Sequence, residues 1–160
     1  MPVLHLLLTL YIVLYGFISQ KNSFFDFLYL FIVYGCPLSW TFYDGECPLT
    51  YYHKKWIDPS YTGRDTKISD DMTSIFGKEV ESFINKHDKI VYFVVSIINA
   101  ISIYLVARRQ NFPMLAIFML LFTTNSYCFT ILNNMKFHFF YRIIFIGVLL
   151  YIFSMYLKSK

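Results

Sequence analysis

The stretch Phe137–Leu157 reads FHFFYRIIFIGVLLYIFSMYL, and Arg142, near its start, is its one charged side chain. The hydrocarbon core of a bilayer is about 30 Å thick, and about 20 apolar residues in an α-helix are needed to cross it. The stretch therefore predicts a membrane-spanning helix. Arg142 is close enough to one end of this helix to reach the headgroup layer.

Four more apolar stretches precede this one: Val3–Ile18, Phe24–Tyr43, Ile90–Ala107 and Pro113–Leu132. The first is the shortest and falls near the lower limit of about 17 residues for a span. Lipid offers the backbone no hydrogen-bond partners, which favours helices, whereas a β-barrel would show short alternating segments. We predict an all-α integral membrane domain over residues 1–160, with about five transmembrane helices.

The composition supports a membrane location. Hydrophobic residues make up 57% of the 160 residues and charged residues 15%, against about 45–50% and about 25% in soluble domains. A soluble chain this short would leave much of that apolar surface in water. We therefore expect the lipid bilayer as the first partner. The net charge of +4 is small, and we expect no nucleic-acid partner.

The segment 44–89 is the one long polar region, and its second half is periodic. Apolar residues follow the spacing of one helical face; they are Ile68, Met72, Ile75, Phe76, Val80, Phe83 and Ile84. This pattern predicts an amphipathic helix from about Asp70 to Asn85. Two placements stay open for it, one on the membrane surface and one against other helices.

Five crossings would place the N-terminus, the long loop and the turn at 133–136 on one side of the membrane. The other side would carry these charges: Lys21, Asp26, Arg108, Arg109, Lys158 and Lys160. Basic residues in short loops favour the cytoplasm, which slightly favours a cytoplasmic C-terminus. The long loop is also basic and opposes this preference. A cellular, an organellar and a viral membrane all stay open.

This topology gathers several potential ligands on the loop side: His5, His53, His87, His138 and Cys47. Haem between membrane helices needs two histidines at similar depth, a condition that His5 and His138 could meet in this topology. His53, His87 and Cys47 are candidate metal ligands. The alternative is that histidines at the interface only hydrogen-bond in the headgroup layer. No cofactor is our expectation, with haem or a metal as the alternative.

The cysteines offer a second possibility for the same side. There is no Cys-x-x-Cys pair, but Cys36 and Cys47 flank the end of the second predicted span. In an oxidising compartment they could form a disulfide. The alternative is a small buried thiol in the helix and an unrelated cysteine in the loop.

The spans lack charges at mid-membrane, which argues against a proton-coupled transporter or a channel with a charged ring. Asn99 and Asn125 lie within spans, and we expect them to hydrogen-bond between neighbouring helices. The chain also lacks a glycine-rich phosphate loop, a His-Glu-x-x-His pair and a Gly-x-Ser-x-Gly elbow. These absences favour a protein that is not an enzyme.

One short motif invites comparison with a known family. Cys47-Pro48-Leu49-Thr50, after the second predicted helix, resembles the signature of an uncharacterised family of small multi-spanning membrane proteins. In that family an acidic residue follows the threonine closely, whereas here Tyr51 follows and Glu46 precedes the motif. The resemblance implies membrane architecture only. Physically, the motif predicts a stiff turn at the interface, with Thr50 capping a short helix through Trp56.

These observations favour a structural, assembly or partner-recruiting component of a membrane. Such a protein would act through helix packing, self-association or other membrane proteins that bind its charged loop. The first alternative is a protein that binds haem, a metal or a lipid ligand on its histidine-rich side. A small transporter or channel is the second.

Overall fold

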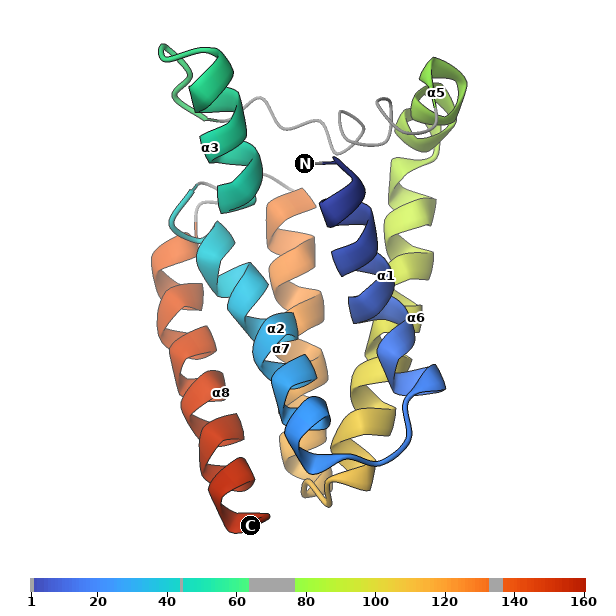
Figure 1. Cartoon of the computed structure of the whole chain (residues 1–160), viewed down its shortest axis with the longest axis vertical. Coiled ribbons are helices and arrows are strands. Elements are labelled where there is room, and N and C mark those ends of the chain that lie inside the picture. Colours follow the sequence, from blue (N-terminus) through green and yellow to red (C-terminus); the bar gives the residue numbers. More distant parts are fainter. Residues whose placement is uncertain (1, 44, 64–76, 133–136) are drawn as a thin grey trace.

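The computed structural model describes residues 2–43, 45–63, 77–132 and 137–160. This part of the chain is helical and contains no strand, which confirms the all-α prediction. The described residues form five long helices and two short ones; the long helices lie side by side, and the short ones lie at one end (Figure 1). Their bounds are α1 Pro2–Ile18, α2 Ser23–Trp40, α3 Pro48–Ile57, α5 Lys78–Lys86, α6 Asp88–Arg109, α7 Met114–Leu132 and α8 His138–Lys158.

Each apolar stretch seen in the sequence forms a helix. Within the part of the chain that the structure describes, three helices are long and apolar enough to cross a membrane: Ser23–Trp40, Lys89–Arg109 and His138–Lys158. The apolar segments Leu6–Ile18 and Met114–Thr130 are shorter. Large apolar side chains face outward along the bundle, among them Leu115, Phe139 and Phe93 at 74%, 73% and 67% exposure. Exposed apolar surface of this extent indicates a membrane protein.

The second helix ends at Trp40, three residues before the end of the apolar stretch that predicts it. Several hydrogen bonds close it, two of them from Thr41 and Gly45. Thr41 Oγ1 donates to the carbonyl oxygen of Leu38 at 2.6 Å, and the Gly45 amide donates to that of Trp40 at 2.9 Å. Gly45 has a φ of 92°, a left-handed conformation that glycine adopts without steric cost at the end of a helix.

The N-terminus lies with α3 and α5 at one end of the bundle, and the C-terminus lies at the other (Figure 1). We call these the α3 end and the C-terminal end. The helix predicted at Asp70–Asn85 is described only in its second half, as α5, because residues 64–76 lie outside the described residues. Helix α3 begins at Pro48 with Cys47 as its N-cap. The predicted cap at Thr50 is therefore wrong, because proline favours the first helical position.

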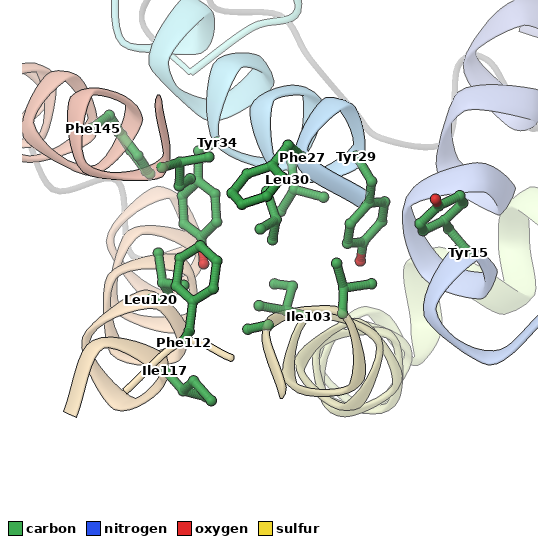
Figure 2. Packing of buried hydrophobic residues seen from close by; sticks show 14 of the residues in the cluster. Tyr15, Phe27, Tyr29, Leu30, Tyr34, Ile103, Phe112, Ile117, Leu120 and Phe145 are labelled. Carbon is green, nitrogen blue, oxygen red and sulfur yellow. The ribbon is translucent and has the colours of Figure 1, made fainter. Parts of the chain in front are cut away.

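Aromatic side chains dominate the core. Tyr29 and Tyr34 from α2 are fully buried, as is Phe145 from α8. Figure 2 shows the Tyr29 and Tyr34 rings projecting from α2 into the bundle, with Phe145 of α8 beside Tyr34 and Tyr15 of α1 facing Tyr29. The Tyr15 and Tyr29 rings stack with centroids 4.7 Å apart. Helix α1 packs mainly against α6 and α2 packs mainly against α8, and the Tyr15–Tyr29 stack links α1 to α2.

Candidate functional site

A buried carboxylate lies at the C-terminal end of the bundle. Asp26, in the first turn of α2, has no exposed surface. Its oxygens accept four hydrogen bonds: from Tyr15 Oη at 3.0 Å, Arg109 Nε at 3.0 Å, an Arg109 terminal nitrogen at 2.8 Å and Gln110 Nε2 at 2.6 Å. A carboxylate offers about four acceptor sites, so Asp26 is saturated. Its place near the helix N-terminus favours the negative charge as well.

The guanidinium of Arg109 is saturated in the same way. Two of its five N–H groups bind Asp26 side-on. The others donate to the carbonyl oxygens of Ser19 (2.7 Å) and Gly16 (3.4 Å), and to the Ser19 hydroxyl. Carbonyl groups in the last turn of a helix have no partner within it, so Arg109 of α6 also caps the end of α1.

Tyr15, Ser19, Asp26, Arg109 and Gln110 together form what we call the Asp26 cluster. It joins α1, α2 and α6 through one ion pair and its surrounding hydrogen bonds. Breaking a buried pair by removing one partner costs about 3–5 kcal/mol, because the remaining charge stays unpaired. Within the cluster no acceptor of Asp26 and no donor of Arg109 is left for a substrate, so the arrangement positions helices.

The sequence analysis identified Asp26 and Arg109 as charges on one side of the membrane but did not predict that they form an ion pair. It did not show that Asp26 is fully buried within the bundle. The pattern that could have predicted the ion pair is a single acidic residue at the start of an apolar span, with an arginine on the same side of the membrane. The charges are paired because an isolated buried carboxylate would be costly.

A second polar junction lies deeper in the bundle and centres on Ser102 of α6. Its Oγ accepts hydrogen bonds from the Gly16 amide at 2.9 Å and from the Tyr29 hydroxyl at 2.8 Å. The Tyr29 hydroxyl also lies 2.9 Å from the carbonyl oxygen of Ile12. The serine therefore links α6 to both α1 and α2, and it is fully buried.

Replacing Ser102 with alanine should lower the free energy of unfolding by about 1 kcal/mol. An interhelical hydrogen bond in membranes is worth about 0.6 kcal/mol, and this variant loses two. Thermal unfolding in detergent measures the change, with Ser96→Ala on the same helix as the control. Equal stability of the two variants would show that the junction contributes nothing.

The asparagines behave differently from the sequence prediction. Asn125 is exposed, and its Nδ2 donates to Leu121 O at 2.8 Å within its own helix, so the predicted interhelical bond is wrong there. The buried Oδ1 of Asn99 makes no hydrogen bond within the described residues. Ser102 makes the interhelical bonds instead.

The structure describes four of the five predicted ligand residues in full. His53 is exposed on α3, Cys47 caps that helix, and His87 lies between α5 and α6 with its ring centroid 4.9 Å from that of Phe83. His138 begins α8, packs edge-on against Tyr127, and its buried Nδ1 makes no hydrogen bond within the described residues. His5 belongs to α1, but its side chain lies outside the described part.

Among the described residues, no three His, Cys, Asp or Glu side chains are grouped so that they could hold a metal ion. The haem pair of His5 and His138 stays a prediction, since the His5 side chain is not described. Cys36 and Cys47 lie within electrostatic range of each other and are not joined by a disulfide in the structure. The predicted bridge between them also stays a prediction.

The α3 end carries a second group of polar and aromatic side chains. Arg142 of α8 donates to the carbonyl oxygen of Thr41 at the end of α2, and its guanidinium lies 4.3 Å from the Phe42 ring centroid. The hydroxyls of Tyr43 and Tyr52 are 3.0 Å apart, and this hydrogen bond raises the pKa of Tyr43. The group joins α2, α3 and α8 where the predicted second span ends.

Beyond α3 the backbone is held by a local turn. Asp58 Oδ1 accepts hydrogen bonds from the hydroxyl of Ser60 at 2.6 Å and from its amide at 2.9 Å, and these lower the pKa of Asp58.

Comparisons of the chain with protein families, with curated proteins and with solved structures found no match. The resemblance of the Cys47–Thr50 motif to a membrane family therefore stays a prediction.

Proposed function

We propose that this chain is a multi-pass integral membrane protein with a structural role in the assembly of a membrane complex. In this proposal the five long helices cross the bilayer, α5 lies at the membrane surface as an amphipathic helix, and the C-terminus is cytoplasmic. The α3 end, with the charged loop, recruits partners or further copies of the chain.

The saturation of the Asp26 cluster carries this proposal. General acid–base catalysis and transport both need a group that can exchange a proton or a ligand. Asp26 instead accepts four hydrogen bonds from this chain, and Arg109 donates all five of its own. Such an arrangement favours a role in holding helices together.

The α5 segment supports the surface placement. Val80 and Phe83 are 37% and 61% exposed, while Lys78 and Lys86 stand at its two ends. Lysines beside exposed apolar residues are typical of helices that lie in the membrane interface, where the apolar face enters the acyl boundary. In the structure α5 packs against α6.

Alkaline carbonate extraction tests membrane integration. We expect the chain to stay with the membrane pellet, because its exposed apolar side chains have no other solvent. The same membranes, dissolved in mild detergent, should give a particle larger than one 19.1 kDa chain, with fixed stoichiometry. Release by carbonate would contradict membrane integration. A single chain with no partner, or ion flux through liposomes that contain it, would contradict the assembly role.

A further inference from the structure

Helix α7 is buried along one face and exposed along the other. Ile117 and Leu120 are 1% and 2% exposed and pack in the core. On the opposite face Leu115, Phe118 and Phe122 are 74%, 62% and 60% exposed. Helix α7 also packs less extensively against α6 and α8 than α1 packs against α6. The outer face of α7 therefore has room for a further helix.

The residues of this outer face recur with the spacing of a helix–helix seam. We call four of them the α7 stripe: Leu115, Phe118, Phe122 and Asn125. Steps of three, four and three residues separate them, and this is the spacing along the line where two supercoiled helices meet. The Phe118 and Phe122 rings stack with centroids 6.2 Å apart and planes inclined by 20°. They form an apolar ridge that needs no rearrangement before another helix packs on it.

Asn125 places a carboxamide in this apolar stripe, well inside α7. It is exposed, and one N–H of its Nδ2 donates to the carbonyl oxygen of Leu121 at 2.8 Å. A carboxamide also carries a second N–H and an oxygen that accepts. Within the described residues, neither of these has a hydrogen-bond partner. Acyl chains offer none, so an outward carboxamide in the bilayer favours association with another polar side chain.

The occupant that fits the α7 stripe is the same stripe on a second copy of the chain. Copies of one chain have the same orientation in a membrane, so a two-fold axis along the membrane normal brings equal residues together at equal depth. The two Asn125 side chains would then face each other. A carboxamide both donates and accepts, so two of them can exchange N–H···O bonds. A helix with apolar residues at this depth, or a lipid chain, would leave both groups unpaired.

We propose that two copies of the chain associate through the α7 stripe, with their Asn125 side chains hydrogen-bonded to each other inside the membrane. A single polar residue in an apolar seam fixes the register and the number of helices that meet there. This inference deepens the proposed function and rests on it, because α7 must cross the bilayer for the carboxamide to meet lipid. It identifies the first partner in the assembly as a second copy of the chain.

The test measures association of the purified full-length chain in phosphatidylcholine vesicles. Native cysteines are replaced, Ser159→Cys carries a donor or an acceptor dye, and energy transfer is followed as the lipid-to-protein ratio is varied. We expect folded Asn125→Ala to need about tenfold more protein per lipid for half association, because it loses the hydrogen bonds between the copies. Asn125→Gln, which keeps the carboxamide, should retain most of the association. Asn99→Ala is the matched control, since Asn99 lies on α6 outside the stripe, and it should associate like the unaltered chain.

Cysteine cross-linking in the same vesicles tests the geometry. With the native cysteines replaced, Phe122→Cys should give a disulfide-linked dimer on oxidation, because equal positions of the stripe meet at the axis. Leu150→Cys is the control, at a similar distance from the C-terminal end of the bundle and 64% exposed on α8. It should stay largely monomeric. Unchanged association of folded Asn125→Ala, or equal cross-linking at the two positions, would overturn the dimer.

These outcomes are separable from failure of the proposed function. If carbonate leaves the chain in the membrane and detergent yields a larger particle, but labelled copies show no energy transfer, the assembly role stands and this inference is wrong. The α7 stripe would then face a different protein or lipid. Release of the chain by carbonate would instead contradict the proposed function itself.

Discussion

Replacing Arg109 with alanine is expected to lower the free energy of unfolding by about 3–5 kcal/mol. The variant leaves the Asp26 carboxylate without a counter-charge at a position with no exposed surface. It also removes the donors to Gly16 and Ser19 that cap α1. Unfolding in detergent, followed by circular dichroism, measures the loss. The effect should change little with salt, because buried pairs are poorly screened.

Arg108→Ala is the matched control for this prediction. Arg108 is exposed, and its guanidinium lies 4.0 Å from the sulfur of Met114, so its removal should cost no more than about 0.5 kcal/mol. Adding Asp26→Ala to Arg109→Ala should cost less than the sum of the two single changes, since the partners are coupled. Additive losses, or equal effects of the two arginines, would show that the ion pair does not hold the helices.

Gly16→Ala is expected to destabilise the chain by about 3 kcal/mol. A Cβ at this position would stand 2.4 Å from the carbonyl oxygen of Ser102 and 2.6 Å from its Cα. Both are backbone atoms, so the contact is relieved only if α1 and α6 separate. That movement would also lengthen the hydrogen bond from the Gly16 amide to Ser102. Small residues at such crossings let membrane helices approach closely.

Gly147→Ala in α8 tests whether the effect comes from packing. Apart from the backbone of its own helix, no atom of the described residues lies within 4 Å of a Cβ placed there, and alanine is the better helix former by about 1 kcal/mol. This variant should be as stable as the unaltered chain or slightly more so. If Gly16→Ala and Gly147→Ala melt at the same temperature, the close crossing of α1 and α6 is not formed.

The helices themselves could be predicted from the sequence. Long apolar runs require helices in lipid, so Phe137–Leu157 and its four companions indicated the elements without knowledge of any contact. The ends were less predictable. The apolar stretch continues past Trp40 to Tyr43. The helix ends at Trp40, where Thr41 and Gly45 form the hydrogen bonds that close it.

The Asp26 cluster could be predicted only in part. Position along the chain placed Asp26 and Arg109 at the same end of the bundle, and that agrees with the structure. The sequence does not fix the rotation of each helix about its axis, and this rotation turns Asp26 inward. The same limit explains the error at Asn125, which faces away from the bundle and bonds to the nearest carbonyl of its own helix.

The close crossing of α1 and α6 at Gly16 could not be predicted from the sequence for a similar reason. A glycine near the end of an apolar run has no pattern that distinguishes it from Gly147, which faces open space. Ser102 likewise looks like Ser96 in the sequence. Gly16 differs from Gly147, and Ser102 from Ser96, in the helix that packs against it. That contact is known only from the packed bundle.

We propose that the chain crosses the membrane an odd number of times, with α3 on one side and the C-terminus on the other. Cysteine accessibility measures this directly, after replacement of Cys36, Cys47 and Cys128. Single cysteines are introduced at exposed positions: His53 and Ser60 at the α3 end, Lys21 and Ser159 at the C-terminal end. A membrane-impermeant thiol reagent is added to sealed, uniformly oriented vesicles.

We expect His53→Cys and Ser60→Cys to react from one side of the membrane. Lys21→Cys and Ser159→Cys should react only from the opposite side, or after the vesicles are opened. Labelling of Lys21→Cys and Ser60→Cys from the same side would mean that α2 does not cross the membrane, and this result would contradict the proposed topology.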